Sequence, residues 1–409
     1  MRLSTSWMYQ QSVNTMLDQQ SAVAATQNQV TTQKRINVAS DDPAGAGQVV
    51  SLSHILAANA QYSSTIDSAN SRLATEQISL TSVGNVLDSA RSLALQGING
   101  SLAGSDRQAV AAQLTQLRDQ LVQIANSTDS HGNALFGGTS NDTTPFVKSS
   151  DGSISYAGND GQLMASIGAG LTTATSDSGN ALFMVIPAGN GSFAASAGSA
   201  NTGSLVVGDN RVSNPVTWNS GVAASGGGYV ISFGAGGRWT AADAKGNGIV
   251  DGSGNAVGGT YADGGTISFN GAAIALSGMP AAGDSVTVAA GASQDIFSTL
   301  SHMISALQNP DASDSALANT LNRQIESLDQ TQGSVTSTEV AIGGRMNTLQ
   351  QQQSAYGDLG VTFNSALSGV QDVDVYTAIS NLSLQSASLQ ASQQMFSQLK
   401  SMSLFNYIK

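Results

Sequence analysis

The residue types that most often perform enzyme or metal chemistry are few and widely spaced in this sequence. Its 409 residues include three histidines and no cysteine. His54, His131 and His302 are far apart, and none forms the His-x-x-x-His pair with which a helix binds a metal ion. Gly-x-Ser-x-Gly nucleophile motifs and Walker phosphate loops are also absent. We therefore predict a protein that is not an enzyme, with no catalytic residues, no cofactor and no bound metal.

One stretch, DAKGNGIVDGSGNAVGG at residues 243–259, has oxygen-bearing side chains at intervals that suggest a calcium loop. The candidate ligands are Asp243, Asn247 and Asp251. An EF-hand would need an acidic or amide residue where Lys245 stands, and a glutamate where Gly254 stands. The many glycines favour an ordinary glycine-rich turn instead.

Four aromatic residues of the glycine-rich middle of the chain, residues 141–293, could bind a sugar by stacking. They are Trp218, Tyr229, Trp239 and Tyr261. Such a surface would make the chain a secreted enzyme or a glycan-binding adhesin, and activity of an isolated 141–293 fragment would support that class. Large aromatic side chains more often belong to the core or turns of a β domain, so the enzyme or adhesin is kept as an alternative only.

The composition limits the partners and the location of the protein. Only 10% of residues are charged, the net charge is −12, and basic residues form no run. Nucleic acids and membranes are therefore not predicted as partners. No apolar run approaches the ~18 residues that span a bilayer, and the first residues lack the pattern of a cleaved signal. Few charges and no cysteine are nevertheless typical of exported bacterial surface proteins, so we predict export without a cleaved signal peptide.

Three regions of different composition follow one another along the chain. Residues 1–140 and 294–409 have helical patterns, whereas residues 141–293 are rich in glycine. The middle region contains the apolar runs ALFMVIP, GSLVVGD, GYVISF, GTISFNG and DSVTV, separated by turn residues. Such runs predict an antiparallel all-β domain. The expected fold is α+β: a long, antiparallel, coiled-coil-like helical bundle formed by the two flanks, with an inserted all-β domain.

The N-terminal flank has the period of a coiled coil. From Leu52 onward, alternating steps of three and four residues reach thirteen positions, of which eleven are apolar. Asn59 and Glu76 interrupt this seam. Asp42 is a suitable cap for a helix over 44–97, which would be roughly 80 Å long at 1.5 Å per residue.

The C-terminal flank repeats this pattern, with a second seam from Leu321 to Leu349. The two flanks bury their seams most simply by packing on each other as one bundle. The predicted parts are terminal helices at 1–40 and 370–409, a helical bundle at 41–140 and 294–369, and the β insertion at 141–293.

Each end of the chain carries a thin apolar stripe. The stripe residues are Tyr9, Met16, Val23 and Val30 near the N-terminus, and Val375, Ile379, Leu382, Leu389 and Phe396 near the C-terminus. The rest of these segments is polar and almost uncharged, and a stripe this thin holds an isolated helix poorly. We predict that both terminal segments are disordered in the monomer and become ordered on assembly, where uncharged side chains avoid burying unpaired charge. A solvated, low-complexity tail is the alternative.

Several stretches of both flanks have the sequence character of one known superfamily. RINVASDDPAGAGQVVSL (35–52), IGGRMNTLQ (342–350) and the tail DVDVYTAISNLSLQSASLQASQQMFSQL resemble segments of bacterial flagellins. The start MRLSTSWMYQQSVNTM and the finish SLFNYI are more similar to the hook–filament junction proteins of that superfamily. So are DSHGNALFGGTSNDTTPF and GTISFNGAAIALSGMPAAGDSVTV, whereas the resemblance is weak across 150–260.

This resemblance implies a structural subunit of the flagellum, exported by the flagellar type III apparatus to an extracellular position. It implies a ring of identical subunits between the first hook-associated junction protein and flagellin. It also implies a cytosolic export chaperone that holds the C-terminal helix before secretion. The nine stripe residues are the candidates for these chaperone and assembly contacts. Flagellin itself, the filament subunit, is the alternative within the superfamily.

Overall fold

The computed structural model of the chain describes residues 5–100 and 102–401. The chain divides into two compact units. The first unit extends to Ser64 and resumes at Gln350, and the second unit is Thr65–Leu349. Both divisions fall inside continuous helices rather than at the changes of composition, so the domain limits inferred from composition stay a prediction.

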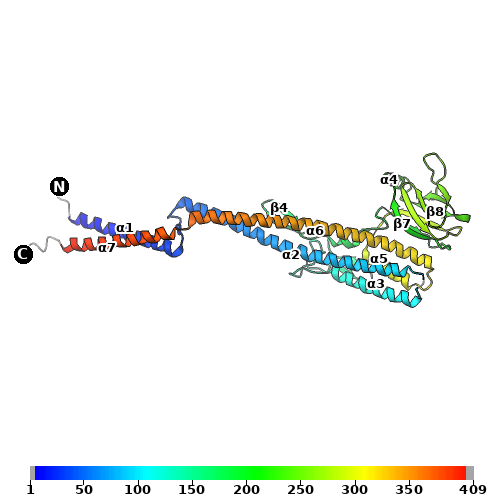
Figure 1. The fold of residues 1–409 in the computed structure, drawn as a ribbon, viewed down its shortest axis with the longest axis horizontal. Helices are drawn as coiled ribbons and strands as arrows, with labels where there is room; N and C mark the ends of the chain where they lie inside the picture. The colour runs from blue at the N-terminus through cyan, green and yellow to red at the C-terminus, as the bar shows by residue number, and fades with distance from the viewer. Residues whose placement is uncertain (1–4, 101, 402–409) are drawn as a thin grey trace, which may run out of the picture. The chain divides into compact units, whose positions relative to one another are not determined.

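The first unit contains an antiparallel pair of terminal helices, α1 (Thr5–Thr32) and α7 (Val375–Ser401). Figure 1 draws them side by side, in blue and red. Helices are thus found where the sequence predicts them, and the proposal that they become ordered only on assembly stays a prediction. The start and finish of the predicted terminal segments, residues 1–4 and 402–409, lie outside the described residues.

Two long helices contribute residues to both units. They are α2 (Pro43–Gly97) and α6 (Asp314–Gln371). The Asp42 carboxylate accepts a hydrogen bond from the Gly45 N–H at 2.9 Å, which satisfies one of the free donors of the first helical turn. The predicted cap and the predicted helix over 44–97 are therefore confirmed.

In the second unit, two shorter helices, α3 (Gly104–Ala125) and α5 (Ile296–Gln308), accompany the long ones (Figure 1). The predicted seam is buried there, as seen at Ile66, Leu73, Leu80, Val83, Leu87, Leu321, Leu328 and Leu349. Packing of the N-terminal flank on the C-terminal flank is thus confirmed. Glu76, an interruption of the seam, is buried as well.

Two short hairpins follow α3 and lie beside the bundle (Figure 1). They are β1 (Phe146–Lys148) with β2 (Ile154–Tyr156), and β3 (Met164–Gly168) with β4 (Leu171–Ala174). A further antiparallel pair joins β5 (Ile186–Pro187) to β14 (Ser293–Gln294), which are distant in sequence. The Phe146 ring lies 5.4 Å from Phe183 and 5.5 Å from Phe297 of α5, centroid to centroid. These buried rings attach the hairpin layer to the bundle.

The run ALFMVIP, predicted as a strand, is not one. Asn180–Met184 form a single π-helical turn, η1, and only Ile186–Pro187 are extended. Leu182 and Phe183 are adjacent in sequence and both buried. A strand would direct these two side chains to opposite faces, so the turn is the conformation that buries both.

The remaining strands form two antiparallel sheets. The larger has the order β10-β9-β8-β13-β6 and comprises Gly258–Thr260, Arg238–Asp243, Gly228–Phe233, Ser285–Ala290 and Phe193–Ala197. The smaller has the order β11-β12-β7 and comprises Thr266–Phe269, Ala272–Ser277 and Val206–Val212. Helix α4 (Pro215–Ala224) and the short turn η2 (Ala235–Gly237) complete this part. One apolar core joins both sheets, which confirms the predicted antiparallel β domain.

Candidate assembly surface

The predicted stripe residues of the two termini lie on α1 and α7. Seven of the nine are half-buried, whereas Tyr9 and Ile379 are 39% and 47% exposed. The rings of Tyr9 and Phe396 meet edge to face, with centroids 5.0 Å apart. The stripes of α1 and α7 therefore cover each other within one chain, as the seams of a coiled coil do. Their role in binding a chaperone or a neighbouring copy stays a prediction.

Uncharged polar side chains also hold α1 and α7 together. Gln19 Nε2 donates to Ser388 Oγ at 3.2 Å, and Thr26 Oγ1 donates to Gln385 Oε1 at 2.8 Å. Thr26 is buried, as is Ala378 on the facing helix. The contact between the two helices thus uses amides and hydroxyls where many surface helices use ion pairs.

A second set of apolar side chains on the same helices faces solvent. This outer apolar set consists of Trp7, Val13 and Leu17 on α1, and Tyr376, Leu384 and Met395 on α7, each 37–90% exposed. Tyr9, Val13 and Leu17 follow one another at intervals of four and so form a ridge along α1. Leu384 and Met395 are eleven residues apart, close to three full turns, and share one side of α7. Exposed apolar side chains are a feature of binding surfaces, so the outer apolar set is a candidate for one.

A hydrogen-bonded clasp joins the turn before α2 to the turn after α6. The Arg35 N–H donates to the Gln371 carbonyl at 2.7 Å, and Arg35 Nη2 donates to the Val370 carbonyl at 2.8 Å. The Val373 N–H donates to the Gln33 carbonyl at 3.1 Å. The last carbonyls of α6 have no hydrogen-bond donors within the helix and lie at the negative end of its dipole. The Arg35 guanidinium supplies both a donor and a positive charge at this position. The clasp therefore holds the end of α1 close to the start of α7, where the two helices begin to pair.

Two aspartates shape the turn that carries Arg35. Asp41 Oδ2 accepts two backbone N–H groups, of which that of Val38 does most to lower the pKa of Asp41. The Gly45 N–H, followed by the Arg35 side chain, lowers the pKa of Asp42. Both carboxylates therefore stay ionised below the ordinary aspartate range. The Arg35–Asp42 pair is largely solvated, so it adds less than the backbone hydrogen bonds.

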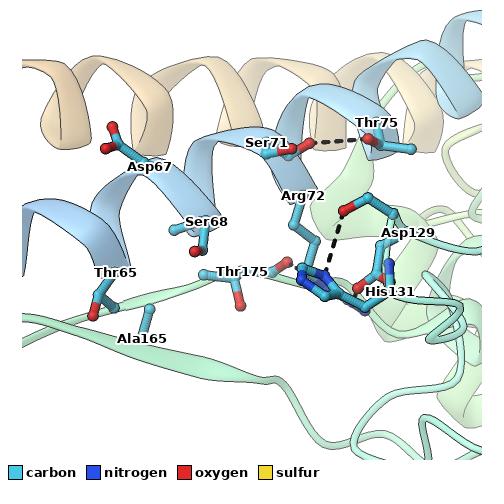
Figure 2. A pocket seen from close by; sticks show the side chains of 12 residues that line it. Thr65, Asp67, Ser68, Ser71, Arg72, Thr75, Asp129, His131, Ala165 and Thr175 are labelled. Atoms are coloured by element: carbon cyan, nitrogen blue, oxygen red, sulfur yellow. Dashed lines mark hydrogen bonds and ion pairs between the residues drawn. The ribbon is translucent and has the colours of Figure 1, made fainter.

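Figure 2 shows a cleft of about 450 Å³ in the second unit, bordered by α2, the turn at 129–131 and the β3–β4 hairpin. Arg72 donates to Asp129 Oδ2 at 2.5 Å and to the Thr175 carbonyl at 3.1 Å. His131, one of the three histidines, lies at the rim beside this ion pair. Across residues 5–100 and 102–401, no three His, Asp or Glu side chains gather in a way that could hold a metal ion. Within the cleft, Arg72 links α2 to the turn at 129–131 and to the end of the β3–β4 hairpin.

Known proteins match the same helical flanks and the fold as a whole. The models for the bacterial flagellin N-terminal and C-terminal helical regions match residues 3–141 and 319–408. Flagellar hook-associated protein 3 of Salmonella typhimurium is 31% identical over 45% of this chain, and that of Escherichia coli is 36% identical over 36%. The crystal structure of Xanthomonas campestris FlgL is 30% identical, with a TM-score of 0.68, over 78% of this chain and 99% of that one. The chain belongs to the FlgL family.

Membership of the FlgL family confirms the superfamily inferred from the flanks. The matched stretches cover 57% and 46% of the Salmonella and E. coli proteins, so the chain spans about half the length of these curated relatives. The family match includes both terminal helices, which carry the stripe and the outer apolar set. None of the helices within the described part of this FlgL family member is long and apolar enough to cross a membrane.

The calcium-like stretch forms two successive turns. Asp243 Oδ1 accepts the N–H groups of Lys245 and Asn247 at 2.9 and 2.8 Å. Asp251 Oδ1 accepts the Asn255 N–H at 2.9 Å in the same arrangement. These carboxylates close the turns in which they stand, which agrees with the interpretation as turns.

The aromatic residues considered for sugar binding lie mainly in the core of the β domain. Trp218, Tyr229 and Tyr261 are buried, and Trp239 is half-buried. The Trp218 ring packs 4.8 Å from Phe193 of the same core. Three of the four rings are thus covered by the core and do not form an exposed sugar-stacking surface in this conformation.

Proposed function

We propose that the chain is a structural subunit of the bacterial flagellum that joins the hook to the filament. The match to X. campestris FlgL over 99% of that chain carries this proposal, because it includes the fold as well as the helical flanks. The flagellin models match the two helical flanks, residues 3–141 and 319–408, and not the region between them, so flagellin is the weaker candidate. The working location would be extracellular, at the hook–filament junction.

Assembly would proceed through the terminal helices. The outer apolar set gives each α1–α7 pair exposed side chains on more than one side, so a ring of identical subunits could bury them between neighbours. One end of such a ring would meet the first hook-associated junction protein, and the other end would meet flagellin. Ordering of the terminal segments would take place at this step and would offset part of the binding energy.

Export would precede assembly. A type III route without a cleaved signal peptide agrees with a chain of few charges and no cysteine. A cytosolic chaperone would hold α7 by its stripe, Val375, Leu382, Leu389 and Phe396, before α1 covers it. This is supported by the half-burial of those four residues in the α1–α7 pair, since the chaperone would replace α1.

The function is tested by a clean deletion of the gene in its host. Cells with hooks but no filaments, which shed flagellin monomers into the medium, would support the junction role. Loss of filaments without flagellin in the medium would point to the filament subunit. Intact working filaments would overturn both flagellar functions.

Two double variants separate the two apolar faces of α7. We expect Leu384→Ser with Met395→Ser to abolish ring assembly while chaperone binding remains. Leu389→Ala with Phe396→Ala should weaken both chaperone binding and ring assembly. The exposed Gln390→Ser is a matched control on the same helix. If the first double variant assembles normally, the outer apolar set is not the assembly surface, and if the second leaves both activities intact, the stripe has neither role.

A further inference from the structure

Glu76 is a charged residue type placed in the apolar seam of α2, and its side chain is 0% exposed. Its Oε1 accepts a hydrogen bond from the Asp177 N–H at 3.1 Å. Its Oε2 is buried and has no hydrogen-bond partner. An ionised carboxylate with a bare buried oxygen is costly, whereas a neutral carboxylic acid costs much less. The surroundings of Glu76 therefore favour the protonated form of its carboxyl group.

The charges around Glu76 are already balanced without it. Arg345 of α6 donates to both carboxylate oxygens of Asp177, at 2.8 and 2.9 Å. Arg72, one helical turn before Glu76, donates to Asp129 at 2.5 Å. These two ion pairs sum to zero charge. An ionised Glu76 would leave the cluster with a net charge of −1, placed on a side chain that is itself fully buried.

The same cluster holds one short segment of backbone, residues 175–177. Arg72 Nε donates to the Thr175 carbonyl, Glu76 accepts the Asp177 N–H, and Arg345 binds the Asp177 side chain. Because this segment directly follows β4, the three contacts fasten the β3–β4 hairpin to α2 and α6.

Three further titratable groups lie near the segment. Tyr156 interacts with Ser178, the residue after Asp177, and with the charge of Asp160. Asp160 accepts hydrogen bonds from Ser178 Oγ at 2.9 Å and from Asn180 Nδ2 at 3.2 Å. His131 lies beside the Arg72–Asp129 pair at the rim of the cleft (Figure 2). Each of these groups borders the cluster, whereas Glu76 lies inside it.

We propose that Glu76 is a proton-operated latch, which in its neutral form fastens segment 175–177 to the two long helices and on ionisation releases that segment with the β3–β4 hairpin. Burial, and then the charge of Asp177, raise the pKa of Glu76 from 4.5 to about 8, against smaller opposing effects of the Asp177 N–H and the two arginines. The folded chain therefore keeps a proton that the unfolded segment loses. The latch is fully effective below pH 4.5, weakens as the pH rises, and is lost once the pH passes the folded-state pKa.

Hydrogen exchange of the Asp177 amide in the full chain tests the latch. Between pH 6 and 8, we expect the protection factor of this amide to fall up to tenfold per pH unit, the limit for one proton. Glu76→Gln should abolish that slope, because glutamine is neutral at every pH. Glu339→Gln is the matched control, since Glu339 accepts a hydrogen bond from Thr81 across the same two helices, and it should keep the wild-type slope. Equal slopes in wild type and Glu76→Gln would overturn the proposal.

A spectroscopic titration keeps the proposal testable if Glu76→Gln does not fold. The infrared C=O band of a protonated carboxylic acid should be present in the wild-type protein at pH 6.5, where ordinary aspartates and glutamates are ionised. It should vanish with a midpoint near 8. A spectrum without this band at pH 6.5 would overturn the proposal. Both outcomes are independent of the junction function, because neither experiment requires assembly.

Discussion

Helix α6 covers the outer edge of the smaller sheet, and one asparagine makes two of the hydrogen bonds there. β7 is the outer strand of the order β11-β12-β7. Asn319 Oδ1 accepts the Val207 N–H at 2.7 Å, and Asn319 Nδ2 donates to the Leu205 carbonyl at 2.8 Å. One turn further, Asn322 Nδ2 donates to the Val207 carbonyl at 3.0 Å. The amides thus take the place of a further strand, which protects the edge.

Asn319→Ala should destabilise the β domain strongly. The change removes both hydrogen bonds and leaves a donor on Val207 and an acceptor on Leu205 without partners, and both residues are buried. Each unsatisfied buried group costs about 1–3 kcal/mol, and alanine returns about 0.5 kcal/mol of helix propensity. We therefore expect the free energy of unfolding of the β domain to fall by about 2–5 kcal/mol. Asn322→Ala removes one hydrogen bond and should cost about 1 kcal/mol.

Urea unfolding of the full chain, followed by tryptophan fluorescence, measures this effect, because the buried Trp218 lies in the core of the β domain. The exposed Asn347 on the same helix provides the control, and Asn347→Ala should leave the β-domain transition unchanged. If Asn319→Ala unfolds within about 0.5 kcal/mol of the wild type, water replaces the amide at no cost and the reasoning is wrong.

Three further outcomes follow from single residues. Gly357→Ala should stabilise α6 by about 0.5–1 kcal/mol, because an added Cβ meets nothing within 4 Å, and a lower melting temperature by circular dichroism would contradict this. The lowered pKa of Asp42 means that its cap on the Gly45 N–H is complete above pH 3.8 and is lost as the pH falls through the folded-state pKa, so protection of that amide should drop only in stronger acid. Phe396→Ala should remove the ring contact with Tyr9 and increase hydrogen exchange near the start of α1 and the end of α7, whereas unchanged exchange would show that the rings contribute little.

The helices could be predicted because their signals are local. A capping aspartate before Pro43 and an apolar residue at each three- or four-residue step mark the start and the buried face of α2 within a few turns. The β8 run GYVISF could also be predicted from local sequence, because turns stand on both sides of it. By contrast, Leu182 and Phe183 lie in an apolar run that strands and helical turns share, and only their joint burial distinguishes the two.

The candidate site was predictable only in part, because its geometry depends on residues far apart in the chain. A seven-residue period selects the stripe, which is the face that α1 and α7 turn toward each other. Leu384 and Met395 stand outside that period, and no local pattern marks them as exposed. Glu76 was visible as an interruption of the seam, but its neighbours Asp177 and Arg345 follow about 100 and 270 residues later.

The two faces of α7 explain why that helix has so few charges. Its stripe is already half-covered by α1, so the stripe alone accounts for one uncharged face. Tyr376, Leu384 and Met395 remain open on other sides, where a helix of an isolated soluble protein would place charged residues. Burying a lysine or glutamate at a contact without a partner costs several kcal/mol, whereas serine and glutamine can find hydrogen bonds in many arrangements. A helix with a single charged residue, Lys400, is therefore suited to neighbours on all sides, which a ring of identical subunits would supply and a monomer does not.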